Sequence, residues 1–251
     1  CTFGLNRNRC SGHTEMAVRN APKYAPIQSI PARPSNPTPL ELAINRFQRE
    51  AVRVRQNLQQ EPKPDGMALK KIKEDLAFLD RELIRISTQS SLQSNLSEYR
   101  ESNKQKKSHE LVKEPHHPTK QLASHLYAVA EPQPSKNHQA HHIVMGKGNA
   151  RMMRTRLQMH LYGIGINDPV NGVWLPRSTA FEGHFTTPKA PPHSRIHSHN
   201  YQTWISDSLV NIRKSETQFV NKLRIIKLDI KNGTHPTKIL EKKDINWSPS
   251  K

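Results

Sequence analysis

The chain has 251 residues, with 39 Lys or Arg against 21 Asp or Glu, so its formal net charge is +18 with the histidines neutral. Only 33% of the residues are hydrophobic, which argues against one large core, and two cysteines are too few for a disulfide scaffold or a Cys-based zinc site. No run approaches the roughly 18 apolar residues of a membrane helix. This composition excludes a spanning helix and favours a polyanionic partner, nucleic acid before an anionic membrane surface.

The first segment, residues 1–37, is predicted to be a flexible tail or linker. It is rich in Pro, Asn and Ser and shows no hydrophobic period. Because the chain begins at Cys1 rather than at a methionine, we expect it to be a piece of a longer one.

Residues 38–115 are predicted to form an antiparallel helical hairpin. The run Thr38-Pro39-Leu40-Glu41 combines an N-cap, a proline at the first helical position and the glutamate of a capping box. A Pro-rich break over 61–66 separates this helix from a second, in which apolar residues from Leu69 to Ile86 alternate three and four apart. Two such helices joined by a short loop pack together, and we expect them to serve for docking or as a scaffold.

Residues 116–137 are expected to be a linker, because they contain two proline-bearing loose patches. A second domain would then occupy residues 138–251. Eight of the 14 histidines lie between His138 and His199, and a His-rich tract without thiolates suits a divalent metal.

The pair His141-His142 enters a short β-branched run. Neighbouring residues of an extended segment point to opposite faces, so one ring can bind a metal while the other acts as a general base. Downstream, Asn171-Gly172 predicts a turn into a second strand. His193 and His197 are four residues apart and share one face if their segment is helical.

A helix is predicted from Asn149 to Tyr162, closed by Gly163. Its apolar residues are expected to pack in the core: Met152, Met153, Leu157 and Leu161. Arginines on its outer face, with one more after the second strand, are candidate phosphate contacts: Arg151, Arg154, Arg156 and Arg177.

Taken together, these motifs resemble the AHH family of the HNH/endonuclease VII superfamily. The resemblance is carried by AHHIV at 140–144, GIGINDPVNGVWLP at 163–176 and IHSHNY at 196–201. It implies an α+β, mainly helical chain, in which a small ββα-metal nuclease domain with extra helices follows the N-terminal helical hairpin.

The resemblance also implies a role for each matching residue. His142 would be the general base, and Asn171 would brace the loop and orient that base. The ligands of a divalent ion would be His141 and His197, joined by His193 or His199. Magnesium, manganese, zinc and nickel all remain open as the ion.

The implied function is that of a metal-dependent endonuclease, with DNA the favoured substrate. Members of this family typically sit at the C-termini of bacterial polymorphic and type VI secretion toxins, so we expect an effector that acts in the cytoplasm of a target cell. Expected partners are a cognate, acidic immunity protein and either a secretion component or an upstream effector region. Two alternatives stay open: a non-catalytic basic nucleic-acid-binding module, and an adaptor hairpin attached to a decayed nuclease.

Overall fold

A computed structural model describes residues 29–60, 65–210 and 215–249. Most of the predicted tail lies outside these residues. The chain divides into two compact units, one up to Ser90 and one from Ser91 onward. Helix α3 (Gly66–Gln105) contributes its first part to one unit and its last part to the other.

The first unit contains helix α2 (Pro39–Gln60) and the beginning of α3. The predicted capping box is present: the Thr38 amide donates to Glu41 Oε2 at 2.8 Å, and the Glu41 amide donates to Thr38 Oγ1 at 3.3 Å. The Asp65 side chain caps α3 by accepting from the Ala68 amide. The predicted start of the first helix is therefore confirmed, whereas the antiparallel packing of the two helices stays a prediction.

The apolar residues of α3 that alternate three and four apart form its least exposed face. Leu79 and Ile86 are buried, and the others between Leu69 and Ile86 are half-buried. The sequence loses its hydrophobic period near residue 88, yet the helix continues to Gln105. It does so because Leu96 and Asn103 are buried in the second unit.

The second unit contradicts the predicted linker over residues 116–137. Helix α5 (Lys120–Ala128) forms inside that stretch, after the short helix α4 (Ser108–Leu111). Leu122 and Leu126 are completely buried, because they cover one face of the sheet described next.

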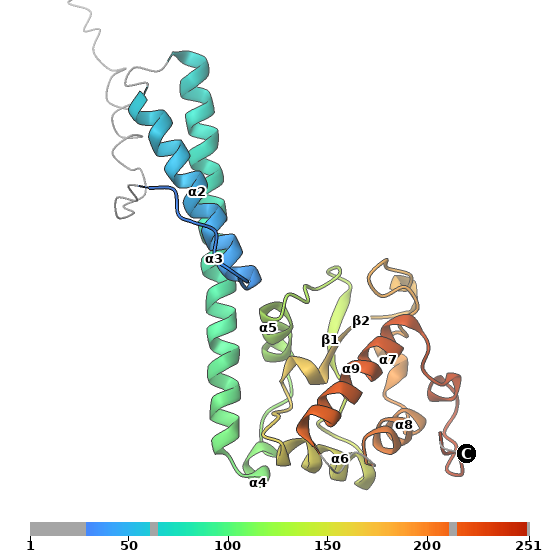
Figure 1. The fold of residues 1–251 in the computed structure, drawn as a ribbon. Coiled ribbons are helices and arrows are strands. Elements are labelled where there is room, and N and C mark those ends of the chain that lie inside the picture. Colours follow the sequence, from blue (N-terminus) through green and yellow to red (C-terminus); the bar gives the residue numbers. More distant parts are fainter. Residues whose placement is uncertain (1–28, 61–64, 211–214, 250–251) are drawn as a thin grey trace, which may run out of the picture. The chain divides into compact units, whose positions relative to one another are not determined.

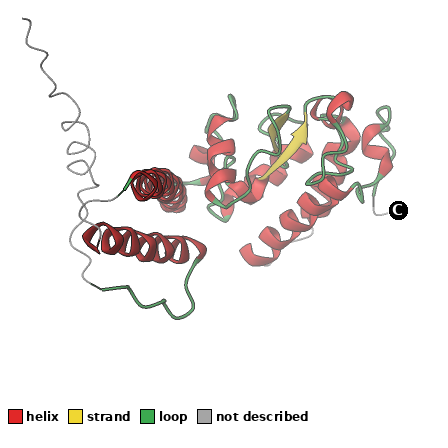
Figure 2. Ribbon diagram, turned by 90° about the horizontal axis from the view of Figure 1, so that it is seen from above, coloured by secondary structure: helices red, strands yellow, loops and turns green. Residues whose placement is uncertain are grey.

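The sheet has two antiparallel strands, β1 (His138–His142) and β2 (Gly172–Pro176), with His141 opposite Val173. Ala140 and Trp174 face α5, whereas Val173 and Leu175 belong to the main core. Helix α9 (Glu216–Asn232) packs against β2 from the other side (Figure 1). The unit is mainly helical around two strands, which confirms the predicted α+β class (Figure 2).

Helix α6 (Ala150–Leu161) connects the strands, and its bounds agree with the predicted helix. The Asn149 side chain caps it by accepting from the Met152 amide, and Gly163 follows with a φ of 70°. The predicted core face is wrong in part: Met152 and Met159 are buried, whereas Met153, Leu157 and Leu161 are exposed. The face that packs on the rest of the unit is therefore rotated from the one predicted.

Helices α7 (His193–Ile196) and α8 (His199–Val210) complete the unit together with α9. Among the described residues, two short 3-10 helices flank β2 in the chain, η1 (Pro169–Asn171) and η2 (Thr179–Phe181), and a third, η3 (Thr237–Leu240), follows α9. Helix α8 packs against α6, α9 and η3, and Tyr201 and Ile205 are fully buried there. In the part of the chain that the structure describes, no helix has the length and apolarity needed to cross a membrane.

Candidate active site

Strand β1 presents its last two histidines to opposite faces of the sheet. His141 is 1% exposed and lies on the face of the main core, while His142 is 5% exposed and lies on the face of α5. Both rings border one cavity of about 90 Å³. The predicted division of the pair between two faces is present.

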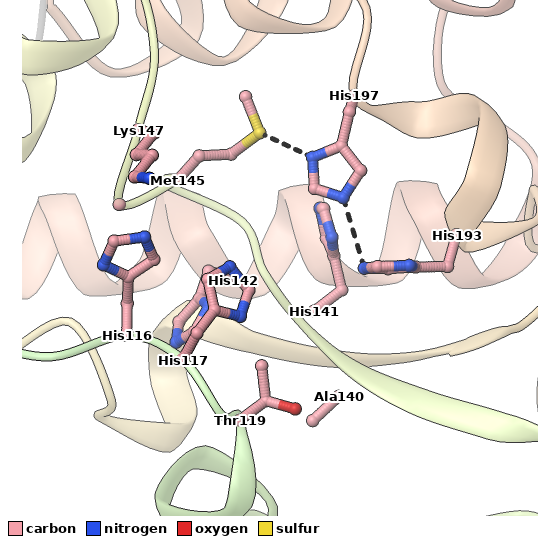
Figure 3. A pocket seen from close by; sticks show the side chains of 11 residues that line it. His116, His117, Thr119, Ala140, His141, His142, Met145, Lys147, His193 and His197 are labelled. Carbon is pink, nitrogen blue, oxygen red and sulfur yellow. Dashed lines mark hydrogen bonds between the residues drawn. The ribbon is translucent and has the colours of Figure 1, made fainter.

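Three imidazoles converge at this cavity. His193 begins α7 and His197 follows its last residue, so that one helical turn sets their Nε2 atoms 3.2 Å apart. The His141 ring lies 5.2 Å from the ring of His193 and 5.0 Å from that of His197, between centroids. One ring nitrogen from each residue lies within 4.8 Å of the others, which is compatible with three ligands to a single cation (Figure 3).

Neighbouring groups decide which nitrogens are available. The Tyr201 hydroxyl donates to the Ile143 carbonyl at 2.9 Å, so its oxygen accepts from His141 Nε2 at 3.2 Å. This leaves Nδ1 of His141 with a free lone pair. His197 Nδ1 contacts Met145 Sδ at 3.1 Å, and its Nε2 faces His193.

Burial lowers the pKa of all three imidazoles. The pKa falls to about 4 for His193 and well below the usual value for His141, and that of His197 is also lowered. The neutral ring is the form that binds a metal. The donor set therefore fits a divalent cation, and three imidazoles suit zinc or nickel better than magnesium or manganese, which prefer oxygen ligands.

His142, on the other face, is held by an asparagine. Its Nε2 lies 3.0 Å from Oδ1 of Asn167. Burial lowers the pKa of His142 to about 4, opposed by the bond to Asn167 and assisted by His116 and His117. The ring is thus neutral at pH 7, as a general base must be before it accepts a proton.

The sequence assigned the orientation of the base to Asn171, and the structure corrects this. The Asn171 side chain accepts from the Val144 amide at 2.7 Å and donates to the carbonyls of Val144 and Ile166. It braces the loop after β1, as predicted, but does not bond to His142 in the described structure. Asn167, four residues earlier in the chain, contacts the His142 ring instead.

This geometry agrees with a comparison against known families. Residues 122–228 match the model of AHH, a nuclease family of the HNH/ENDO VII superfamily with conserved AHH. This stretch is similar to the AHH nuclease family, and residues 122–228 are called the AHH domain below. No curated protein and no solved structure matches the chain.

The AHH tripeptide is Ala140-His141-His142, the last three residues of β1. Residues outside the AHH match also line the cavity. His116 and His117 lie beside His142, with ring centroids 6.3 Å away in both cases (Figure 3). The sequence feature that could have revealed these two residues is a second His-His pair. It directly precedes Pro118, in a segment expected to be a linker.

The close-up also shows Lys147 bordering the same cavity as these histidines. Lys147 is exposed, so its ammonium group is available to a phosphate. It lies in the loop between β1 and α6, and no motif in the sequence pointed to it.

Other predicted site residues lie away from the histidine cluster. His199 begins α8 and is absent from the three-histidine group and from the cavity lining found among the described residues. Arg151, Arg154 and Arg177 are exposed and stay predicted phosphate contacts. Arg151 lies 3.8 Å from Asp207.

Arg156 does not lie on the outer face of α6, contrary to the prediction. It is 3% exposed, and its guanidinium donates to His160 Nε2, to the Gly146 carbonyl and to the Val112 carbonyl. The residue thus ties the AHH domain to the segment before α5. His160 accepts from this guanidinium and belongs neither to the three-histidine group nor to the cavity lining found among the described residues.

Proposed function

We propose that the chain is a metal-dependent endonuclease in which His142 acts as general base. One observation carries this proposal: the neutral His142 ring borders the same cavity as three imidazoles that converge to within ligand distance of one another. A base and a cation site on one small cavity are the two requirements for hydrolysis of a phosphodiester.

His141, His193 and His197 would hold the cation. When bound, a divalent ion would supply electrostatic stabilisation of the phosphate and of the departing oxygen. His142, whose Nε2 faces Asn167, would take a proton from water at Nδ1. The water oxygen then bonds to phosphorus while the bond from phosphorus to the leaving oxygen breaks, and solvent protonates that oxygen.

The charge of the chain supports nucleic acid as the substrate. A net charge of +18 and the exposed arginines of α6 favour contacts to phosphates rather than to bases. We propose DNA as the preferred form and a poorly sequence-selective cleavage. The same charge also fits a non-catalytic binding module, so the deciding test must separate cleavage from binding.

The test compares the full chain with His142→Ala on supercoiled plasmid and on a structured RNA, with Mg²⁺, Mn²⁺, Ni²⁺ or Zn²⁺ and with EDTA. We expect nicking by the wild type that EDTA abolishes, and a loss of about 10²- to 10⁴-fold in the variant, the usual contribution of a general base. His109→Ala, an exposed residue of α4, is the matched control and should cleave normally. Retained plasmid binding without cleavage by the wild type, with every metal, would favour the binding module.

We further propose that the nuclease is an antibacterial effector, delivered to the cytoplasm of a target cell and neutralised in the producing cell by an acidic immunity protein. The support is the family resemblance stated above and the strongly basic surface, which an acidic inhibitor would complement. Induced expression in a bacterium should stop growth with the wild type and not with His142→Ala. Equal growth of the two strains, at equal protein levels, would argue against a toxin.

A further inference from the structure

Every polar group of Asn167 has a partner within the second unit. Its amide donates to Tyr99 Oη at 3.1 Å, and its carbonyl lies 2.8 Å from His125 Nδ1, which donates to it. Its side-chain Nδ2 lies close to three further groups, and its Oδ1 faces His142. The residue is 1% exposed, so its position is fixed from all sides.

The three groups around Nδ2 determine which way the side-chain amide points. Nδ2 donates to Glu114 Oε1 at 2.7 Å, to the Pro115 carbonyl at 3.0 Å and to Gln121 Oε1 at 3.2 Å. A proline carbonyl can only accept a hydrogen bond, so the NH₂ end of the amide must lie here. Its oxygen must then face the imidazole.

This orientation selects one tautomer of His142. Because Asn167 Oδ1 can only accept, His142 Nε2 must carry the proton at their 3.0 Å contact. Nδ1 then keeps its lone pair and is the nitrogen that can take a proton from water. Asn167 therefore does for His142 what the hydroxyl of Tyr201 does for His141.

Four of the groups that hold Asn167 come from before residue 122, where the AHH match begins: Tyr99, Glu114, Pro115 and Gln121. Tyr99 lies on α3 and Glu114 follows α4. Tyr99 Oη donates to Glu114 Oε1 at 2.8 Å, and Glu114 Oε2 accepts from the Ile166 amide at 3.2 Å. Tyr99 packs so closely against Gly165 that a Cβ at that position would overlap its hydroxyl.

We propose that Asn167 is the positioning residue of the base His142, and that Tyr99 and Glu114 belong to the catalytic unit because they fix Asn167. The proposal rests on the proposed nuclease function for its kinetic part and on geometry alone for the tautomer. The family match does not include the segment from Tyr99 to Gln121. The proposal gives this segment a part in catalysis without contact to the substrate.

The first experiment measures the tautomer of His142 in the full chain by ¹⁵N NMR of labelled histidines, with assignment by loss of the signal in His142→Ala. We expect the wild type to show a protonated Nε2 and an unprotonated Nδ1 at pH 7.5. Asn167→Ala should give a mixture of both tautomers. An unchanged Nε2–H tautomer in Asn167→Ala would overturn the proposal, whether or not the chain cleaves nucleic acid.

The second experiment measures kcat and KM on plasmid together with Zn²⁺ affinity by calorimetry. Asn167→Ala should lower kcat about 10- to 100-fold, the range for partners that orient a functional side chain. KM and Zn²⁺ affinity should change by no more than about twofold, because the substrate and the cation would contact other residues. A comparable loss of Zn²⁺ affinity, or an unchanged kcat, would contradict a positioning role. If neither the wild type nor any variant cleaves, the proposed nuclease function is wrong. The NMR result still decides whether Asn167 sets the tautomer of His142.

Variants of the two supporting residues complete the test. Tyr99→Phe removes only the hydroxyl, and Glu114→Gln keeps the shape of the side chain. Each should lower kcat less than Asn167→Ala does, whereas Glu114→Ala should approach it. Glu101→Gln, whose partner is the exposed Lys104 on the same helix, is the matched control. Normal kcat in Tyr99→Phe and in Glu114→Ala, both folded by circular dichroism, would remove the segment from the catalytic unit.

Discussion

A single buried hydroxyl links the core of the AHH domain to the three-histidine cluster that is the candidate cation site. Tyr201 is completely buried on α8, and its oxygen joins His141 Nε2 to the Ile143 carbonyl. Partners of this kind fix the tautomer and the ring orientation of a metal-binding histidine. The tyrosine thus contributes both to the packing of the core and to the position of His141.

Replacing this tyrosine by phenylalanine keeps the packing volume and removes the hydrogen bonds. Tyr201→Phe is expected to lower Zn²⁺ affinity about 10- to 100-fold. It should also cost about 1–3 kcal/mol of folding stability, because the Ile143 carbonyl loses its donor. Competition with a fluorescent chelator and urea unfolding measure the two effects. Ser206→Ala on the same helix is the control, since that buried Oγ has no hydrogen-bond partner among the described residues; equal affinities in the two variants would contradict the role of the hydroxyl.

At the scale of elements, α5 positions β1 from the outer side of the sheet. Leu126 is fully buried against Leu122, Ala140 and Trp174. Ala140 directly precedes the two functional histidines, so packing that holds Ala140 also holds the end of the strand. The small sheet needs this cover, because two strands alone do not form a stable unit.

Leu126→Ala should therefore destabilise the second unit by about 2–5 kcal/mol, as large-to-small core substitutions do. Leu161→Ala, on an exposed position of α6, is the matched control and should change stability by no more than about 0.5 kcal/mol. Chemical unfolding followed by tryptophan fluorescence gives both values, because Trp174 lies in the affected cluster. Similar losses in the two variants would mean that α5 does not anchor the strand.

The sequence predicted those features that depend on local spacing. The AHH pair on an extended strand and the i, i+4 pair His193 and His197 are of this kind. The base-orienting asparagine was misplaced, because the choice between Asn167 and Asn171 depends on how the turn before β2 folds in three dimensions. Helix α5 was missed because nearby prolines outweighed the i, i+4 spacing of Leu122 and Leu126, a signal that short segments give only weakly.

At the scale of the whole molecule, the excess of 18 positive charges predicts that affinity for nucleic acid falls as the salt concentration rises. Each phosphate that a cationic side chain neutralises releases counterions, so log K should fall linearly with log salt. A site that covers about six phosphates would lose about 10³-fold in affinity between 50 and 200 mM salt. Binding measured with His142→Ala avoids cleavage during titration and should follow the same line.

The exposed arginines of α6 can show which part of the chain carries the phosphate contacts. Charge reversal of both Arg151 and Arg154 should weaken binding and make the salt slope shallower by about two phosphate contacts, irrespective of DNA sequence. Arg53→Glu on α2, where the arginine is exposed and paired with Glu50, removes a cation from the first unit for comparison. If the α6 double variant keeps the wild-type slope while Arg53→Glu makes it shallower, the hairpin region rather than the nuclease domain carries the phosphate contacts. Fluorescence anisotropy with a labelled duplex at four salt concentrations distinguishes the two results, because the slope counts contacts regardless of any change in absolute affinity.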